Sequence, residues 1–231
     1  MCYLVKDLTN PTSDGVELKR LHVKRCIIIP AWVPDCFSEI VSIESDDIII
    51  CADGGYLAAQ REGIIPQLII GDFDSMPMDA VDCCNINIQK AAVEKDETDT
   101  FLCMQKGIEL GCSHFLLVGG FGGRWDHTLA HFQIMAWATR RGFDFEIRGI
   151  GNSVSMMLPG ERELVRQEGY KLSILAYGGK AEGVTLSNVK YPLCDAILSD
   201  DYPLGISNEF LHGNAYISFK SGLLLIFLSK D

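Results

Sequence analysis

Four short runs of the chain consist almost entirely of apolar residues. They lie at residues 26–29, 48–51, 68–70 and 115–118. Strands of a parallel sheet that is covered on both faces have this continuous apolar pattern. The pattern therefore predicts buried parallel strands in the first part of the chain.

The segments around these runs repeat apolar residues at the spacing of an amphipathic helix. We expect helices at residues 56–62, 100–110 and 129–139, each ending near a glycine. Strands that alternate with helices predict an α/β domain with a mostly parallel sheet. In the third helix, the stripe expected to face the core consists of Leu129, Phe132, Met135, Ala136 and Thr139.

The pattern changes near residue 150, after an alternating strand at residues 143–148. Short strands separated by turns follow, and their spacing predicts an all-β sandwich or small barrel. We expect them at residues 154–158, 171–177, 181–193 and 215–228, the last segment resembling a hairpin and its run 223–228 forming a central strand.

Three parts of the chain follow from these patterns. We expect a loosely ordered extension at residues 1–20, an α/β domain at residues 21–150 and a β-sandwich at residues 151–231. The chain has 231 residues, which is long enough for one large or two small domains.

Charge and composition exclude several classes of protein. The net charge of −11 argues against a nucleic-acid or anionic-membrane surface, because both need clustered Lys and Arg. The chain has no apolar run of membrane-spanning length and no apolar signal-peptide core near its start. Its nine cysteines include no CxxC pair, so we interpret them as small buried hydrophobes in a reducing compartment. We expect a cytoplasmic protein.

The most informative stretch is Gly71-Asp72-Phe73-Asp74-Ser75, directly after the third apolar run. Carboxylates one residue apart in a turn can share one hard cation, and their oxygens suit Mg²⁺ better than zinc or copper. An α/β sheet places its ligands at the ends of such strands. A solvated turn would also explain the residues, since Asp and Ser are common in turns.

A second acidic stretch, Lys95-Asp96-Glu97-Thr98-Asp99, precedes the second expected helix. Asp96 or Thr98 is a candidate N-cap, and the helix dipole favours acids in the first turn. Capping accounts for these residues without a catalytic role, and a role in binding stays open.

The fourth apolar run leads into a glycine-rich turn at residues 119–123 and then into a helix. This layout brings backbone N–H groups and a helix N-terminus to a phosphate. The turn has neither the GK[ST] of a Walker A loop nor the GxGxxG of a dinucleotide site. Tight geometry alone could explain the glycines, but Arg124 favours a phosphate ligand. His127 alone fits a hydrogen-bonding role at the helix start, and Trp125 and Trp137 fit packing roles.

Taken together, the stretches resemble the thiamin pyrophosphokinase family in its bacterial form. Each motif is weak alone, but the joint order and spacing are specific. The resemblance covers roughly residues 26–231 and implies an α/β domain followed by a β-sandwich. The matching segments are residues 53–55, 71–75, 96–99, 122–127, 188–193 and 205–209.

The resemblance implies transfer of the pyrophosphoryl group of ATP to the hydroxyl of thiamin, giving thiamin diphosphate and AMP. It also implies a homodimer in which thiamin lies between the α/β domain of one subunit and the β domain of the other. On this basis Asp72, Asp74 and Asp99 are the expected catalytic Mg²⁺ ligands. Further residues expected to bind ATP, metal or thiamin are Asp53, Gly54, Lys95, Asp96, Thr98, Gly122, Gly123, Arg124, Asp126, His127, Ser207 and Asn208.

Two alternatives stay open at this point. A Mg²⁺-dependent phosphatase or glycosyltransferase also uses a DxD turn after a strand, but neither explains residues 96–99 or 122–127. A thiamin- or nucleotide-sensing protein without turnover would fit the same fold. Loss of an acid from the cluster would favour the sensor, and here all the acids are present.

Overall fold

The computed structural model describes residues 24–33, 39–73, 86–91 and 96–230. The earlier elements are β1 (Arg25–Ile29), β2 (Ile48–Ala52), α1 (Gly55–Arg61), β3 (Leu68–Gly71), β4 (Asn87–Lys90), α2 (Asp99–Glu109), β5 (His114–Val118), α3 (Trp125–Thr139) and β6 (Asp144–Gly149). The later strands are β7 (Asn152–Met157), β8 (Gly160–Leu164), β9 (Lys171–Ala176), β10 (Ala181–Ser187), β11 (Leu193–Leu198), β12 (Ala215–Phe219) and β13 (Leu224–Ser229).

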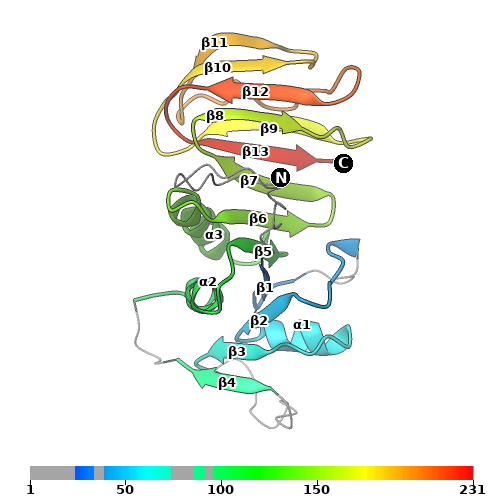
Figure 1. Cartoon of the computed structure of the whole chain (residues 1–231), viewed down its shortest axis with the longest axis vertical. Helices are drawn as coiled ribbons and strands as arrows, with labels where there is room; N and C mark the ends of the chain where they lie inside the picture. Colours follow the sequence, from blue (N-terminus) through cyan, green and yellow to red (C-terminus); the bar gives the residue numbers. More distant parts are fainter. Residues whose placement is uncertain (1–23, 34–38, 74–85, 92–95, 231) are drawn as a thin grey trace, which may run out of the picture.

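Two sheets organise these strands. The nine-stranded sheet has the order β4-β3-β2-β1-β5-β6-β7-β13-β9, and the four-stranded sheet has the order β11-β10-β12-β8 (Figure 1). Strands β4 to β6 pair in parallel, whereas β7, β13 and β9 pair antiparallel. The expected fold class, a mostly parallel α/β part followed by an all-β part, is confirmed.

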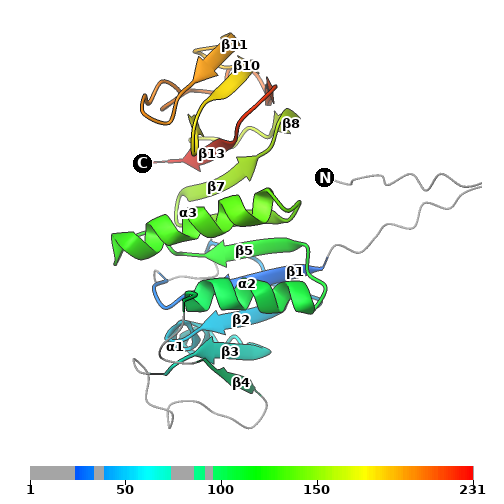
Figure 2. The same ribbon diagram turned by 90° about the vertical axis from the view of Figure 1, so that its left-hand side faces the viewer.

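Helices cover both faces of the parallel strands. On one face α1 packs through Tyr56, Ala58 and Ala59 onto the side chains of alternate strand positions. On the other face α2 and α3 pack through residues such as Met104 and Met135, and Figure 2 shows both helices on the side facing the viewer. Burial on both faces explains why these strands are apolar at every position.

The β-sandwich shares a sheet with the α/β part. Its core lies between β7, β13 and β9 on one side and the four-stranded sheet on the other, with Leu172, Ile226, Val184 and Ile217 among its buried residues. The expected boundary near residue 150 falls in the turn between β6 and β7, which are hydrogen-bonded neighbours. The division into domains stays a prediction, and one sheet runs through it.

The central position expected for residues 223–228 agrees with the structure, because β13 lies between β7 and β9. The expected hairpin at residues 215–228 is wrong, since β12 and β13 belong to different sheets. Both strands face the same sandwich core from opposite sides, so the sequence pattern resembles that of paired strands. The single strand expected at residues 181–193 is also wrong: β10 ends at Ser187, and Asn188 has a φ of 58°.

The buried stripe of α3 differs from the expected one. Leu129 is 58% exposed, whereas the polar Thr128 and His131 are buried. The helix also buries Ile134, Met135, Ala136, Ala138 and Thr139. The prediction of Leu129 as a core residue was wrong because apolar periodicity does not detect polar side chains that are buried with hydrogen-bond partners.

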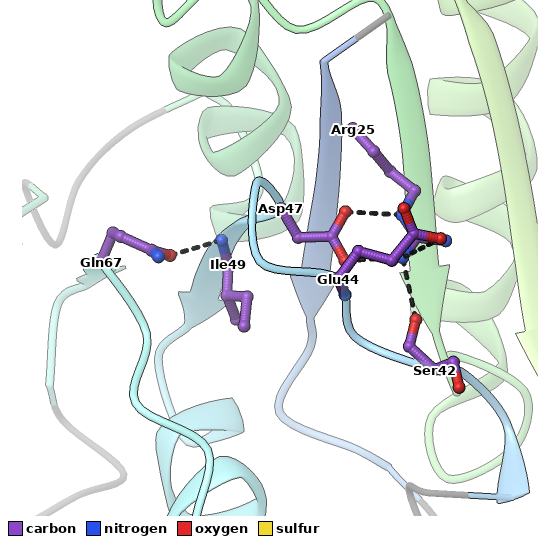
Figure 3. Close-up of polar contacts among 6 residues, drawn as sticks. All are labelled: Arg25, Ser42, Glu44, Asp47, Ile49 and Gln67. Carbon is purple, nitrogen blue, oxygen red and sulfur yellow. Dashed lines mark hydrogen bonds and ion pairs between the residues drawn. The ribbon is translucent and has the colours of Figure 1, made fainter.

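Polar contacts between side chains and backbone of the same chain connect the amino-terminal ends of the parallel strands (Figure 3). Arg25 donates from Nε and Nη2 to the two carboxylate oxygens of Asp47 at 2.7 and 2.6 Å. The same guanidinium donates to the Ser42 carbonyl at 2.8 Å, and the Glu44 N–H donates to Asp47 at 2.7 Å. Gln67 accepts from the Ile49 N–H at 2.6 Å. These contacts fix the starts of β1, β2 and β3.

Cysteine burial follows the expectation in four of five described cases. Cys26, Cys51, Cys103 and Cys112 are buried, and Cys194 is exposed. The other four cysteines lie outside the described residues. In the described ranges, each helix is too short or too polar to cross a membrane.

Candidate functional site

The candidate site lies at the carboxyl edge of the parallel strands. Strands β1, β2, β3 and β5 run in parallel, so the residues that follow them emerge at one edge of the sheet. Helix α2 follows β4, which pairs in parallel with β3, and α3 follows β5. The N-termini of both helices therefore lie at the same edge. The four motifs singled out from the sequence are therefore brought to one side of the sheet.

Asp53 follows β2 directly and is 8% exposed. Its backbone is in the left-handed region, with a φ of 44°, and its N–H donates to the Ile70 carbonyl at 2.8 Å. Gly71 at the end of β3 is packed against it, because a methyl group at Gly71 would lie 2.9 Å from Asp53 Oδ1. Gly54 follows as the N-cap of α1. The carboxylate of Asp53 is thus held at the point where β2 and β3 end.

Asp72 and Phe73 continue from β3 at this edge. Asp72 is half-buried, whereas Phe73 is buried and has a φ of 62°. A positive φ at a bulky residue costs energy and occurs where the surrounding structure enforces it. Asp74 and Lys95 lie outside the described residues. Within the described ranges, no group of three or more His, Cys, Asp and Glu side chains gathers closely enough to hold a metal ion.

The second acidic stretch starts α2 with a side-chain cap. Thr98 is the N-cap, and its hydroxyl accepts a hydrogen bond from the Phe101 N–H at 3.3 Å. Asp99 is the first helical residue and is half-buried, whereas Asp96 is exposed. Of the two candidate caps, Thr98 is therefore the one used. The stretch both caps the helix and carries Asp99 at the site edge.

The glycine-rich turn after β5 has an unusual backbone. Gly119, Gly120, Gly122 and Gly123 all have positive φ values, between 64° and 99°. A residue with a Cβ adopts this region at a cost, so glycine is required for the turn. The ring of Trp32 lies against it, since methyl groups at Gly122 and Gly123 would come within 3.0 and 2.9 Å of ring atoms. The turn is thus shaped by its glycines and flanked by an aromatic ring.

Arg124 and Asp126 form a fork at the start of α3. Arg124 donates from Nε and Nη2 to the two oxygens of Asp126 at 3.2 and 2.6 Å, and the His127 N–H donates to Asp126 at 3.0 Å. The hydrogen bond from Arg124 lowers the pKa of the Asp126 carboxyl, and the same bond raises the pKa of the guanidinium. Arg124 is exposed and stays charged, so its remaining N–H groups suit an anion.

The two C-terminal candidates, Ser207 and Asn208, differ in burial and in the hydrogen bonds of their side chains. The side chain of Asn208 is buried: it accepts from the N–H groups of Tyr191 and Glu209 at 3.0 and 2.9 Å and donates to the Tyr191 carbonyl at 2.7 Å. Ser207 is exposed, has a φ of 57° and donates its N–H to Ser173 Oγ at 2.9 Å. Asn208 therefore fixes a turn, which leaves Ser207 at the surface beside it.

Sequence reasoning missed three residues that shape this edge. Trp32 follows β1 and lies some ninety residues from the turn that it covers, and so no local pattern indicates the contact. Thr128 and His131 are polar residues one helical turn apart, a spacing that could have marked them as one face of α3.

Of the two tryptophans expected to pack, Trp137 contacts Phe101 at a ring-centroid distance of 5.1 Å. The expectation for Trp125 was wrong, because it is 77% exposed.

Comparisons with known proteins agree with this arrangement. Residues 41–147 match the catalytic domain of thiamin pyrophosphokinase, and residues 161–224 match its vitamin B1 binding domain. The chain is 30% identical over 190 residues to thiamine pyrophosphokinase of Bacillus subtilis, covering 79% of this chain and 87% of the relative.

Solved structures give the same result. The crystal structure of thiamine pyrophosphokinase from Bacillus subtilis is 26% identical with a TM-score of 0.79, covering 90% of this chain and all of that one. The corresponding structure from Geobacillus thermodenitrificans is 26% identical with a TM-score of 0.78, covering 90% and 98%. The chain therefore belongs to the thiamin pyrophosphokinase family, enzymes that form thiamin diphosphate from thiamin.

Proposed function

We propose that the protein transfers the pyrophosphoryl group of ATP to the hydroxyethyl oxygen of thiamin. In this reaction the thiamin oxygen forms a bond to the β-phosphorus of ATP, and the bond between that phosphorus and the α–β bridging oxygen breaks. The hydroxyl proton is lost, and the products are thiamin diphosphate and AMP. The nucleophile is neutral and the electrophile is highly charged, so the task is one of positioning and charge neutralisation.

One observation carries this proposal: acids and a glycine-rich turn that leads to Arg124 share the carboxyl edge of one parallel sheet. Asp53 and Asp72 follow neighbouring strands, and Arg124 with the turn 119–123 follows β5 two strands away from β2. A polyphosphate needs cationic donors, and a cation that it shares needs carboxylates. Family membership supports thiamin as the acceptor.

The residues at this edge fit a hard divalent cation by the chemistry of their donors. We propose that Asp72, Asp74 and Asp99 hold Mg²⁺. Asp53 packs against Gly71, the residue before Asp72, where the absence of a side chain leaves room for its carboxylate. When bound, Mg²⁺ would neutralise charge on the phosphates of ATP. Crowded carboxylates repel one another, and a shared cation is the physical reason to gather them.

The chain's own groups have distinct tasks. Arg124 binds phosphate oxygens through N–H groups that it does not donate to Asp126, and Asp126 holds the guanidinium in place. The Gly123 N–H and the start of α3 add positive potential at the same position. Lys95, Asp96 and Thr98 belong to the acidic stretch that carries Asp99, and His127 follows Arg124 and Asp126 in the sequence. We expect the turn of Ser207 and Asn208 to contact thiamin, within a homodimer.

A product assay tests the proposal. Purified protein is incubated with ATP, Mg²⁺ and thiamin, and the assay resolves thiamin monophosphate from diphosphate and AMP from ADP. We expect thiamin diphosphate and AMP in equal amounts, with both lost on removal of Mg²⁺ or in Asp74→Asn. Monophosphate with ADP would exclude transfer of two phosphates. Thiamin binding without any product would instead favour a sensor.

A further inference from the structure

His131 is a buried polar residue at the carboxyl edge, two turns into α3. It is 5% exposed, and its ring lies between the glycine-rich turn and the first turn of α2. The ring Nδ1 is 3.1 Å from the Gly120 carbonyl oxygen, and Nε2 is 3.5 Å from Thr100 Oγ1. Thr100 follows Asp99 directly in the sequence. One side chain therefore touches both segments that bear the expected ligands of ATP and metal.

The contact to Gly120 fixes a tight part of the turn. A methyl group at Gly120 would lie 2.9 Å from His131 Nδ1, so the ring packs directly on the backbone. The Gly120 carbonyl also accepts from Thr128 Oγ1 at 3.3 Å, and Thr128 Oγ1 in turn accepts from the Gly122 N–H at 3.4 Å. Thr128 and His131 thus hold the turn from a single face of α3.

The hydrogen-bonding pattern defines the state of the ring. A carbonyl only accepts, so Nδ1 carries the hydrogen and donates it to Gly120. Burial lowers the pKa of His131, which outweighs the opposite effect of the Gly120 carbonyl and keeps the ring neutral. In the neutral ring Nε2 is an acceptor that faces the Thr100 hydroxyl. Nδ1 is therefore the donor to Gly120, and Nε2 is the acceptor that faces Thr100.

We propose that His131 is a positioning residue for nucleotide binding, which fixes the glycine-rich turn and the first turn of α2 relative to each other. The inference rests on the proposed function, since it takes this turn to bind the phosphates of ATP. His131 is too buried to contact the nucleotide and acts through the backbone of Gly120. Its loss leaves that carbonyl with one donor fewer and loosens the turn where phosphate contacts need a defined geometry.

Three substitutions separate the two nitrogens. In His131→Asn the side-chain amide can occupy the position of Nδ1 and donate to Gly120. In His131→Gln the amide reaches the position of Nε2, and in His131→Leu both contacts are lost. We expect the KM for ATP to rise about tenfold in the Leu and Gln variants and the KM for thiamin to change less than about twofold. His131→Asn should restore the KM for ATP to within about threefold of the wild type.

Thr139→Val provides the matched control. Thr139 is also a buried polar residue of α3, but it is the last residue of the helix, two turns beyond His131. This variant should lower the thermal midpoint as His131→Leu does, without moving either KM. A general loss of packing would raise both KM values together or leave Asn and Leu equal, and either result would overturn the inference.

Calorimetric titration with Mg²⁺ and ATP, without thiamin, distinguishes the inference from the proposed function. If the wild type binds ATP but forms no thiamin diphosphate, the proposed function fails while the binding constants still test His131. If the wild type is active and His131→Leu binds ATP as tightly, the inference alone fails. Lack of ATP binding by the wild type would overturn both.

Discussion

Two carboxylates at opposite ends of β2 have similar burial and different surroundings. Asp47, just before the strand, is 5% exposed and accepts three hydrogen bonds, two of them from Arg25. Asp53, just after it, is 8% exposed and sits on left-handed backbone against Gly71. At the amino edge Arg25 pairs with the Asp47 charge, and no described residue from 39 to 47 has a positive φ. At the carboxyl edge Asp53 and Phe73 both have positive φ values, a form of backbone strain that occurs at sites that bind ligands.

The largest expected effect concerns a charge at the carboxyl edge. Asp72→Asn should lower kcat/KM about a hundredfold or more, because a proposed metal ligand loses its charge while its shape is kept. The product assay measures the change. Asp46→Asn, at the amino end of β2, is the matched control and should keep wild-type activity. Equal losses in the two variants would show that the edges do not differ in function.

At the amino edge we expect a substitution to lower stability and to leave activity nearly unchanged. Asp47→Asn removes the charge partner of Arg25, whose side chain is 20% exposed, and should lower the free energy of unfolding by about 2 kcal/mol. Urea unfolding measures this loss. Activity assayed well below the unfolding temperature should stay within about twofold of the wild type. A fall in kcat without a loss of stability would contradict the assignment of this pair to folding.

A methyl group tests the contact between β2 and β3. Gly71→Ala would place a Cβ 2.8 Å from the Cβ of Asp53 and 2.9 Å from its Cα, so one of the two segments must shift. We expect about 1–2 kcal/mol of destabilisation and about a tenfold fall in kcat/KM. Gly63→Ala is the control: Gly63 has a φ of 68° but open space around it. That variant should lose about 1 kcal/mol of stability and no activity.

The smallest effect is a pH dependence of stability. Burial raises the pKa of Asp47, but hydrogen bonds from Arg25 and Glu44 outweigh it and leave the pKa below its ordinary value of 3.8. The unfolded state then binds the proton more readily. The stabilisation is complete above about pH 5 and is lost as the pH falls through the folded-state pKa.

The difference between wild type and Asp47→Asn isolates this effect from the other carboxyls. Urea midpoints between about pH 3 and 6 should show the two proteins converging as the pH falls. A constant gap across this range would mean that Asp47 does not lose its stabilising charge there.

The sequence predicted the buried half of the fold well. Strands such as β1 and β2 are buried on both faces, and so their apolar runs carry a clear signal. Strands β4 and β8 were missed because they lie at sheet edges and expose most of their side chains, with Lys90 and Glu161 among them. Edge strands are fixed by a neighbour's hydrogen bonds, which no local pattern records.

The same limit applies to the candidate site. Its acids, glycines and Arg124 could be predicted because parallel strands bring their ends to one edge. The groups that hold these residues in place could not be predicted from the sequence. Trp32 meets the turn only in the folded chain, and His131 is a polar residue whose burial depends on the Gly120 carbonyl. Such contacts are set by tertiary structure rather than by residue type.

The place of β13 between β7 and β9 has a consequence for synthesis on the ribosome. Both neighbours are made earlier than the strand that joins them, by about seventy residues in the case of β7. Until β13 emerges, β7 presents an unsatisfied edge and β9 has no neighbour in the large sheet. A nascent chain can complete its parallel strands early, but its β-sandwich must wait for the last strand. For that period the edges of β7 and β9 are open to pairing with other chains.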